Sequence, residues 1–495
     1  MKNSQNLKNL ESSVQKSTGI TKKQALAVYN ANLVDSSLNC RGMIIVFKGI
    51  IKAVFLGDVK NATEAGKIVS SVLGEETPAV FIDAKNLTIM PSFVDMHAHF
   101  RYPGQTQKED LDSGLEAACA GGFGAVVAMP NTKPVVSSGV MAKKIMEEAR
   151  SRQKASLIQA VSITKDFDGK TTDHLDSLSS SEFPVISEDG HDVPEADIML
   201  AAMKKAAENR NIVCCHCEDT SLAVAARPYR TRALDFMKKY DVPAGKINAD
   251  VSQVPDSVNF EIDGNLKAAN KLLSLAEDSA TERNIEIAKV AGCHIHICHC
   301  STAQSINAVR RAKNAVHGGA FNNGFNCTVE VTPHHLGLSG TEAPYIRALV
   351  NPPLRSEEDR LALIAAIKDG TVDVIATDHA PHTQEDKAAG APGFSGLETA
   401  FAVCNTVLVK KEGLPLEKLS RLMSENPARL LKLNQGKLVP GMEADFVLVD
   451  PNENWTVQTK NFKSRGKSSP FDEKVLTGRI HATFYKGNLV YKAEK

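Results

Sequence analysis

The sequence predicts an α/β fold, namely a (β/α)8 TIM-like barrel with a small β domain built from both chain ends. The chain has 495 residues, which is more than one hydrophobic core usually spans. Between residues 91 and 432, short apolar runs alternate with helical patterns, as in a parallel barrel. Strand-like runs precede this stretch and return after it, and we expect these two flanks to share one β domain.

The first β-rich flank covers residues 23–90 and is punctuated by Gly and Asn. It follows a polar segment, residues 1–22, which lacks the apolar centre of a signal peptide and which we expect to be a disordered tail. The strands expected in this flank cover residues 24–32, 42–47, 49–55 and 80–83.

The barrel pattern begins with the apolar run 87–94, which is interrupted by a Pro-Ser step. Further strands are expected at residues 125–129, 156–164, 184–187, 212–216, 294–299, 328–332 and 372–377. Helices are expected at residues 140–152, 194–208, 281–291, 303–315 and 360–368. Residues 230–265 have weak periodicity, and we expect an insertion or long loop there. The second β-rich flank, residues 433–495, has expected strands at 436–439, 444–449, 456–457, 482–485 and 490–491.

The composition is that of an ordinary globular protein. Lys and Arg together number 58, as do Asp and Glu, so the formal net charge is zero, which disfavours nucleic-acid or membrane-surface binding. No apolar run approaches the roughly 18–20 residues of a membrane span, and we expect a cytoplasmic protein. The Cys-rich runs 214–217 and 293–300 have the character of strands, whereas structural zinc sites use Cys pairs on turns.

The stretch Asp95-Met96-His97-Ala98-His99-Phe100-Arg101 ends the first apolar run. Side chains alternate along a strand, so His97 and His99 point to the same face and can bind one divalent metal ion. Taken alone, the motif fits a pair of structural core histidines better. The metal site is favoured because four more ligand-type residues follow at strand ends.

These four residues are Asp189, His216, His299 and Asp378, each at the end of an apolar run. Strand alternation puts His299 on the face of two buried isoleucines, and His294 and His296 on the outward face or in a second layer. Asp189 precedes a glycine, so a turn residue or a helix cap is the alternative. Four His and two Asp at one barrel rim can hold two metal ions in a hydrolytic site.

At this point the sequence resembles a known family. The stretches 95–101, 103–104, 129–132, 351–355, 377–382 and 396–399 together resemble the dihydroorotases of the amidohydrolase superfamily. The run 425–428 and the run 440–445 are similar to the return of that superfamily into its β domain. The resemblance covers roughly residues 24–492.

The resemblance implies two zinc ions per chain. His97, His99 and Asp378 would hold one ion and His216 and His299 the other, with Asp189 bridging both as in the bacterial-type dihydroorotases. Many relatives bridge with a modified lysine instead, and the residues available for that role here are Lys154, Lys165, Lys170, Lys204 and Lys205. Asp378 would also move the proton from the attacking water to the leaving nitrogen.

The resemblance implies reversible cyclisation of N-carbamoyl-L-aspartate to L-dihydroorotate in de novo pyrimidine biosynthesis. Arg101, Asn131 and His382 would bind the substrate carboxylate, and Asn351 the ring amide. Residues 381–393 resemble a mobile loop over the site. The alternatives are a hydantoinase or allantoinase, and an inactive relative that binds aspartate carbamoyltransferase. A homodimer or larger homo-oligomer and a carbamoyltransferase partner are expected.

Overall fold

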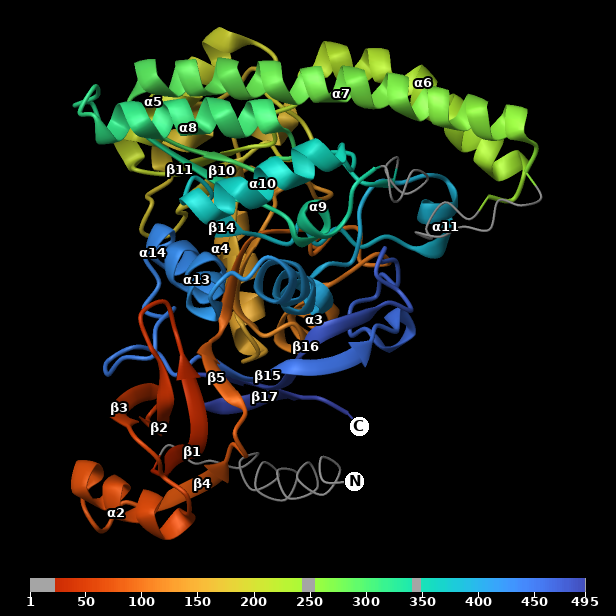
Figure 1. The fold of residues 1–495 in the computed structure, drawn as a ribbon. Helices are drawn as coiled ribbons and strands as arrows, with labels where there is room; N and C mark the ends of the chain where they lie inside the picture. Colours follow the sequence, from red (N-terminus) through yellow and green to blue (C-terminus); the bar gives the residue numbers. More distant parts are fainter. Residues whose placement is uncertain (1–22, 243–253, 341–348, 495) are drawn as a thin grey trace.

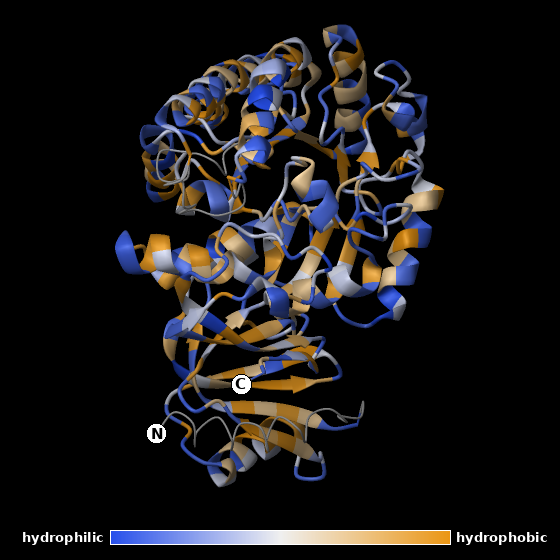
Figure 2. Ribbon diagram, turned by 90° about the vertical axis from the view of Figure 1, so that its right-hand side faces the viewer, coloured by the Kyte–Doolittle hydropathy of each residue, from blue (hydrophilic) through white to orange (hydrophobic). Residues whose placement is uncertain are grey.

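The computed structural model describes residues 23–242, 254–340 and 349–494 (Figure 1). The tail expected at residues 1–22 therefore lies outside the described residues. A barrel with helices around it forms the upper part of Figure 1, and a β domain lies below it. Figure 2 shows hydrophobic strands inside both parts and hydrophilic stretches on the outer helices. No helix in the described part of the chain is long and apolar enough to cross a membrane.

The barrel consists of parallel strands in sequence order. β8 and β9 are separated only by Ala160, and if they count as one strand the described residues form a barrel of eight strands. A bridge between Ala98 at the end of β6 and His379, in the segment that follows β14, closes the ring. The strands are β6 (Phe93–Ala98), β7 (Phe123–Ala128), β8 (Ser156–Gln159), β9 (Val161–Ser162), β10 (Val185–Ser187), β11 (Ile212–Cys215), β12 (His294–Ile297), β13 (Asn326–Val331) and β14 (Val374–Ile375).

Helices cover the outside of this ring. Most begin at a side-chain cap that satisfies free backbone N–H groups, for example the capping boxes at Asp110 and Ser356. The helices between strands are α3 (Leu111–Ala120), α4 (Gly139–Ser151), α5 (Ala196–Asn209), α6 (Thr220–Lys239), α7 (Asp256–Ala291), α8 (Ala303–His317), α9 (Pro333–Gly337) and α10 (Glu357–Asp369). After β14 come α11 (Gln384–Ala388), α12 (Ala400–Cys404), α13 (Leu416–Ser420) and α14 (Asn426–Leu430).

The β domain combines both ends of the chain in one sheet, ordered β17-β16-β15-β5-β1-β2-β3, with β4 beside β1. β5 pairs with β1 on one side and β15 on the other, which joins the two flanks. Its core includes Phe446 stacked on Phe484, with ring centroids 4.4 Å apart. The elements are β1 (Ala25–Val34), β2 (Asn39–Phe47), β3 (Ile50–Leu56), α2 (Ala62–Leu73), β4 (Ala79–Asp83), β5 (Thr88–Pro91), β15 (Phe446–Thr456), β16 (Val475–Tyr485) and β17 (Asn488–Lys492).

Two of the sequence expectations are wrong in detail. Residues 230–265 were expected to be an insertion or a long loop, and the long loop is wrong, because residues 230–239 belong to α6 and residues 256–265 to α7. Residues 243–253 lie outside the described part. These helices pack against each other through Ala233, Met237, Ile262 and Leu266, which form a small apolar cluster of their own. Because polar residues separate these widely spaced apolar positions, the helical pattern is weak in the sequence. The strand expected at 436–439 is an irregular segment that belongs to no strand.

Candidate metal centre

Four histidines surround Asp189 at the end of the barrel where the strands terminate. Asp189 Oδ1 lies 3.2 Å from His97 Nε2, 3.3 Å from His216 Nδ1 and 3.4 Å from His299 Nε2. Its other oxygen, Oδ2, lies 3.4 Å from His99 Nε2. Strands β6, β10, β11 and β12 therefore contribute to one cluster, although its members are far apart in the sequence.

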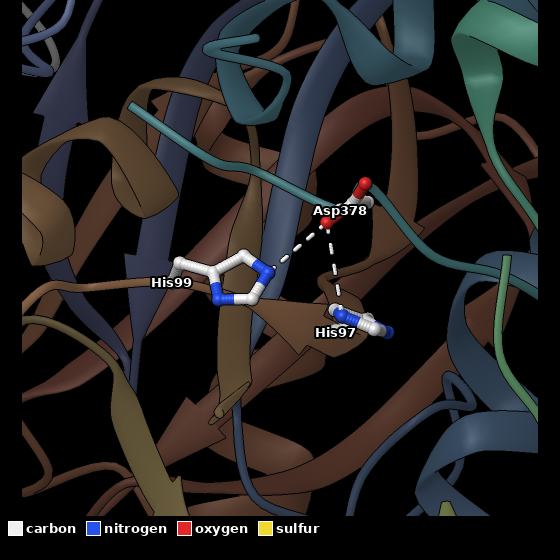
Figure 3. A group of neighbouring side chains, drawn as sticks. All are labelled: His97, His99 and Asp378. Atoms are coloured by element: carbon white, nitrogen blue, oxygen red, sulfur yellow. Dashed lines mark hydrogen bonds and ion pairs between the residues drawn. The ribbon is translucent and has the colours of Figure 1, made fainter. Parts of the chain in front are cut away.

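Asp378 completes this cluster from the segment after β14. Its Oδ1 lies 3.1 Å from His99 Nε2 and 3.7 Å from His97 Nε2 (Figure 3). The structure thus brings together all six residues expected from the sequence. Each is buried, with at most 5% of its surface exposed.

The donor atoms fit a metal ion. His97 Nε2 and Asp189 Oδ1 are buried and make no hydrogen bond of normal geometry, although they lie only 3.2 Å apart. Leaving such atoms without a partner is unfavourable unless something else binds them. His97, His99 and Asp378 form one group whose ligand atoms lie within 4.8 Å of one another, and His97, Asp189 and His299 form another. Imidazole nitrogens and carboxylate oxygens are common ligands of divalent metals.

The pKa values of the buried carboxylates and histidines also favour a bound cation. Burial alone would raise the pKa of Asp189, but His97, His216 and His299 hold this pKa well below its usual value. Burial alone would lower the pKa of His97, but Asp189 and Glu330 hold it well above its usual value. The pKa of Asp378 is lowered by His99 first and then by His97 and His299, against the effect of burial. The carboxylates therefore stay ionised only beside positive charge, which metal ions bound here would supply.

Backbone geometry helps to aim these side chains. Arg101, His299 and Asp378 have φ values of 55°, 32° and 47°, in the left-handed region that residues other than glycine rarely adopt. Each lies just beyond the end of a barrel strand. Such conformations persist only where the surrounding contacts enforce them, and they gather at functional sites.

Glu330 on β13 connects the two sides of the cluster, and the sequence analysis did not identify it. Its Oε1 lies 2.8 Å from His97 Nδ1 and accepts the His299 backbone N–H at 3.1 Å. Its Oε2 lies 3.0 Å from His296 Nε2. The signal was a carboxylate inside the apolar run 326–331, where a charge is seldom buried without a partner. Glu330 directs the other nitrogen of His97, Nε2, toward Asp189.

His294 and His296 lie in a second layer beneath Glu330, which is one of the two placements expected from the sequence. The expectation that Ile295 and Ile297 face inward is wrong, because both pack in the core cluster with residues of the surrounding helices. His296 is fully buried, and its Nδ1 lies 2.8 Å from Thr328 Oγ1. His294 Nε2 contacts the same hydroxyl at 2.9 Å. Cys298 also forms a group with His97 and Glu330, but these two already bond to each other. The ten cysteines are all free, and Cys214 and Cys215 lie on β11 rather than on a turn.

Arg101 lies beside the cluster, and only 9% of its surface is exposed. Its Nε donates to Pro381 O at 3.3 Å, and its Nη2 lies 3.3 Å from His382 Nε2. No carboxylate lies within ion-pair distance of its guanidinium among the described residues. Burial lowers the pKa of Arg101 to about 10, and the group stays cationic at neutral pH. A buried guanidinium without a carboxylate partner is suited to binding an anionic ligand.

The remaining predicted residues flank the histidines. Asn131 Oδ1 lies 2.9 Å from His99 Nδ1. Asn351 Nδ2 lies 3.4 Å from His216 Nε2 and donates to both oxygens of Glu218 at 3.1 Å. Glu218, two residues after His216, was also missed. Its oxygen Oε1 lies 3.7 Å from His216 Nε2.

The segment 381–393, expected to be a mobile loop, contains α11. Lys387 holds it in place through hydrogen bonds to backbone carbonyls. The Lys387 ammonium donates to the backbone carbonyls of Leu349, Ala391 and Gly393 at 3.1, 2.7 and 2.7 Å. None of the five lysines considered as a bridging group is buried, and Lys165 is exposed.

Comparison with known proteins agrees with this geometry. The family model described as "Amidohydrolase family" matches residues 88–490. A protein named "Dihydroorotase" from Clostridium botulinum (strain Eklund 17B / Type B) is 36% identical over 468 residues, which cover 94% of this chain and 99% of that protein. Another of the same name, from Lactobacillus gasseri, is 36% identical over 445 residues, covering 86% and 93%. The solved L-hydantoinase (dihydropyrimidinase) from Arthrobacter aurescens has a TM-score of 0.76 at 21% identity, covering 95% and 96%, and shares the fold.

A closed parallel barrel with His and Asp ligands at one end and an adjoining β domain defines a metal-dependent hydrolase of the amidohydrolase type. The chain belongs to the amidohydrolase family and, within it, to the dihydroorotases.

Proposed function

We propose that this protein interconverts N-carbamoyl-L-aspartate and L-dihydroorotate with two bound zinc ions. The observation that carries the proposal is the ring of four imidazoles around Asp189, next to a buried arginine without a carboxylate partner. The first feature suits hydrolysis of an amide, and the second suits a ring that carries a carboxylate. The 36% identity to dihydroorotases over nearly the whole chain supports the same substrate.

His97, His99 and Asp378 would hold one ion, and His216 and His299 the other. Asp189 would be shared, because its Oδ1 lies within 3.4 Å of three of the histidines and its Oδ2 lies 3.4 Å from His99. This position and the exposure of Lys165 favour aspartate over a modified lysine as the bridge. When bound, the ions polarise the amide carbonyl and lower the pKa of the attacking water.

Asp378 is the proposed general base and acid. Its carboxylate is ionised and lies against His99, so it can take a proton from the water that attacks the ring carbonyl. It then delivers this proton to the ring nitrogen as the carbon–nitrogen bond breaks. Ring closure follows the same steps in reverse.

Arg101, Asn131 and His382 would bind the substrate carboxylate, and Asn351 the ring amide. His382 Nε2 lies 2.9 Å from Pro392 O, so it donates there and cannot also accept from Arg101. One N–H of Arg101 Nη2 is therefore available to a carboxylate oxygen. Burial lowers the pKa of His382 to about 3, so this histidine is neutral at physiological pH and has a single N–H. To bind the substrate carboxylate, that N–H would have to leave Pro392 O.

A hydantoinase or allantoinase is the second candidate, and the shared fold with an L-hydantoinase is the observation in its favour. Those substrates carry no ring carboxylate, so Arg101 argues against them. An inactive partner of a carbamoyltransferase is less well supported, because the residues expected as ligands are all present. The cytoplasmic location, the homodimer or larger homo-oligomer and the aspartate carbamoyltransferase partner rest on the family resemblance alone.

The test is elemental analysis of the purified protein combined with turnover assays. We expect about two zinc ions per chain, hydrolysis of dihydroorotate and cyclisation of carbamoyl aspartate, all lost on chelation and restored by zinc. Arg101→Ala should raise KM for dihydroorotate by at least about tenfold. The proposal would be contradicted if the metal-loaded protein did not hydrolyse dihydroorotate but hydrolysed hydantoin or allantoin.

A further inference from the structure

The β domain contacts the barrel beside the segment that follows Asp378. The contact is made by residues 463–468, here named the brace, which lie between β15 and β16. We propose that the brace is a positioning element for the carboxylate-binding end of the site, so that the β domain helps to set substrate affinity. This inference rests on the proposed function of Arg101 and His382.

The first contact is made through Ser395, which is 2% exposed. Its backbone N–H donates to Ser468 O at 2.8 Å, and its hydroxyl donates to Gly466 O at 2.7 Å. The preceding residue, Phe394, accepts the N–H of Ala380 at 2.8 Å. The brace thus lies next to a short extended segment that itself pairs with the chain directly after Asp378.

The second contact is made through Glu109, a fully buried carboxylate. It accepts the Ser464 hydroxyl at 2.5 Å and the Arg465 backbone N–H at 3.1 Å. The same carboxylate lies 3.2 Å from His379 Nε2. His379 is the neighbour of Asp378 in the sequence, so Glu109 links the brace to the backbone at the proposed base.

The third contact is steric. A Cβ atom added at Gly466 would lie 2.6 Å from Pro381 Cβ, 2.9 Å from Pro381 Cα and 2.8 Å from Ser395 Oγ. The backbone of residue 466 therefore lies directly against Pro381. Pro381 O accepts the Arg101 Nε–H, and His382 follows it in the chain.

Together these contacts fix the position of Pro381. Moving Pro381 shifts both the acceptor that orients the Arg101 guanidinium and the backbone of His382. None of the six proposed metal ligands, Asp378 included, bonds directly to the brace among the described residues. The brace reaches Asp378 only through Glu109 and His379, whereas Gly466 lies directly against Pro381. A change in the brace should therefore weaken substrate binding more than it alters metal binding or the chemical step.

Gly466→Ala tests this inference, because it adds one methyl group against Pro381. With zinc-loaded protein and dihydroorotate, we expect KM to rise about tenfold or more, with kcat within about twofold and zinc content unchanged. The matched control is Gly42→Ala in β2, in the same sheet but in no contact with the site; its Cβ would lie 2.4 Å from Phe55 O. This control should lower the thermal midpoint and leave KM unchanged.

If Gly466→Ala does not fold, Ser395→Ala removes the bond to Gly466 without adding volume, and a rise in KM of a few-fold is expected. The inference is wrong if KM stays within about twofold in the folded variants, or if Gly42→Ala raises KM equally. Wild-type protein measured in the same assay separates the two proposals. If the wild-type protein does not turn over dihydroorotate, both the proposed function and this inference are wrong. If the wild-type protein turns over dihydroorotate normally and the variants keep its KM, only the inference is wrong.

Discussion

The mouth of the barrel and the core of the β domain are equally buried but differ in the kind of side chain they bury. Around Asp189 the barrel buries four histidines and the carboxylates of Asp378 and Glu330. The centre of the β sheet buries apolar groups, among them Phe446, Phe484 and Leu448, none of them exposed. Burying ionisable groups is unfavourable unless they are paired or bind a metal, whereas burying aromatic rings stabilises directly.

This difference assigns separate roles to the two regions. The barrel mouth should determine metal binding and catalysis, and the sheet core should determine the free energy of unfolding. The brace, residues 463–468, is the place where the two roles meet. Substitutions in each region can show how far the separation holds.

The largest effect is expected at the centre of the barrel mouth. Asp189→Asn removes the charge that four imidazoles share, and we expect kcat to fall by about 10³-fold or more and zinc content to drop. Zinc analysis and turnover of dihydroorotate measure both. The control is Asp192→Asn, a nearby buried carboxylate that bonds to Arg283 and Asn284. A full zinc complement with near-normal turnover in Asp189→Asn would contradict the shared role of this carboxylate.

The second effect belongs to the sheet core. Phe484→Ala removes a fully buried ring that stacks on Phe446, and it should lower the free energy of unfolding by about 3–5 kcal/mol. Zinc content and KM of the folded fraction should not change. Urea unfolding measures the loss, and Val475→Ala, at an exposed position of the same strand, is the control. If zinc is lost below the unfolding transition, the two regions are not separate.

The third effect lies beneath the metal centre. Glu330→Gln weakens the contact that orients His97, and we expect zinc affinity to fall about 10–100-fold. Competition with a chelator measures the affinity independently of activity. Glu277→Gln is a matched control, because this buried carboxylate bonds to Arg355 and Ser301 instead. The control should lose stability and keep its zinc affinity, and equal affinity losses in both variants would mean that Glu330 acts only through general stability.

Much of the barrel was predictable from the sequence, because its apolar runs end in polar residues at one rim. The motif 95–101 indicates its two ligands by strand alternation. The same rule assigned the wrong inward face to β12, and His299 reaches the site because it lies beyond the strand end with a φ of 32°. The α/β fold and the family were confirmed by the relatives that cover nearly the whole chain. The convergence of Asp189, His216 and Asp378 was expected because each follows an apolar run at one barrel rim, and the family resemblance then assigned which residues would share an ion.

Other features depend on contacts that a single sequence does not reveal. Glu330 and Glu218 act through partners far away in the chain, and one buried carboxylate in a strand does not say which histidine it meets. The pairing of α6 with α7 depends on a local apolar cluster too sparse to give a clear period. The brace depends on a glycine whose importance is visible only against Pro381.

The smallest effect is a pH dependence at the edge of the β domain. Glu453 contacts His481 at 2.7 Å and Arg479 at 2.8 Å, which lowers the pKa of Glu453 to about 2. A carboxylate whose pKa is lowered by folding stabilises the folded state above its unfolded pKa of about 4.3. That stabilisation is lost as the pH falls toward 2.

Between pH 5 and pH 2, the wild-type protein should therefore lose more unfolding free energy than Glu453→Gln. The excess should be only about 0.2–1 kcal/mol, because solvent screens the partly exposed pair. Denaturant unfolding of zinc-free protein across this range measures it, and leaving zinc out removes the titration of the metal ligands from the comparison. Parallel pH profiles in the two proteins would mean that these contacts add nothing to stability. In that case the apolar core alone would account for the stability of the β domain, and the contrast with the charged barrel mouth would be sharper.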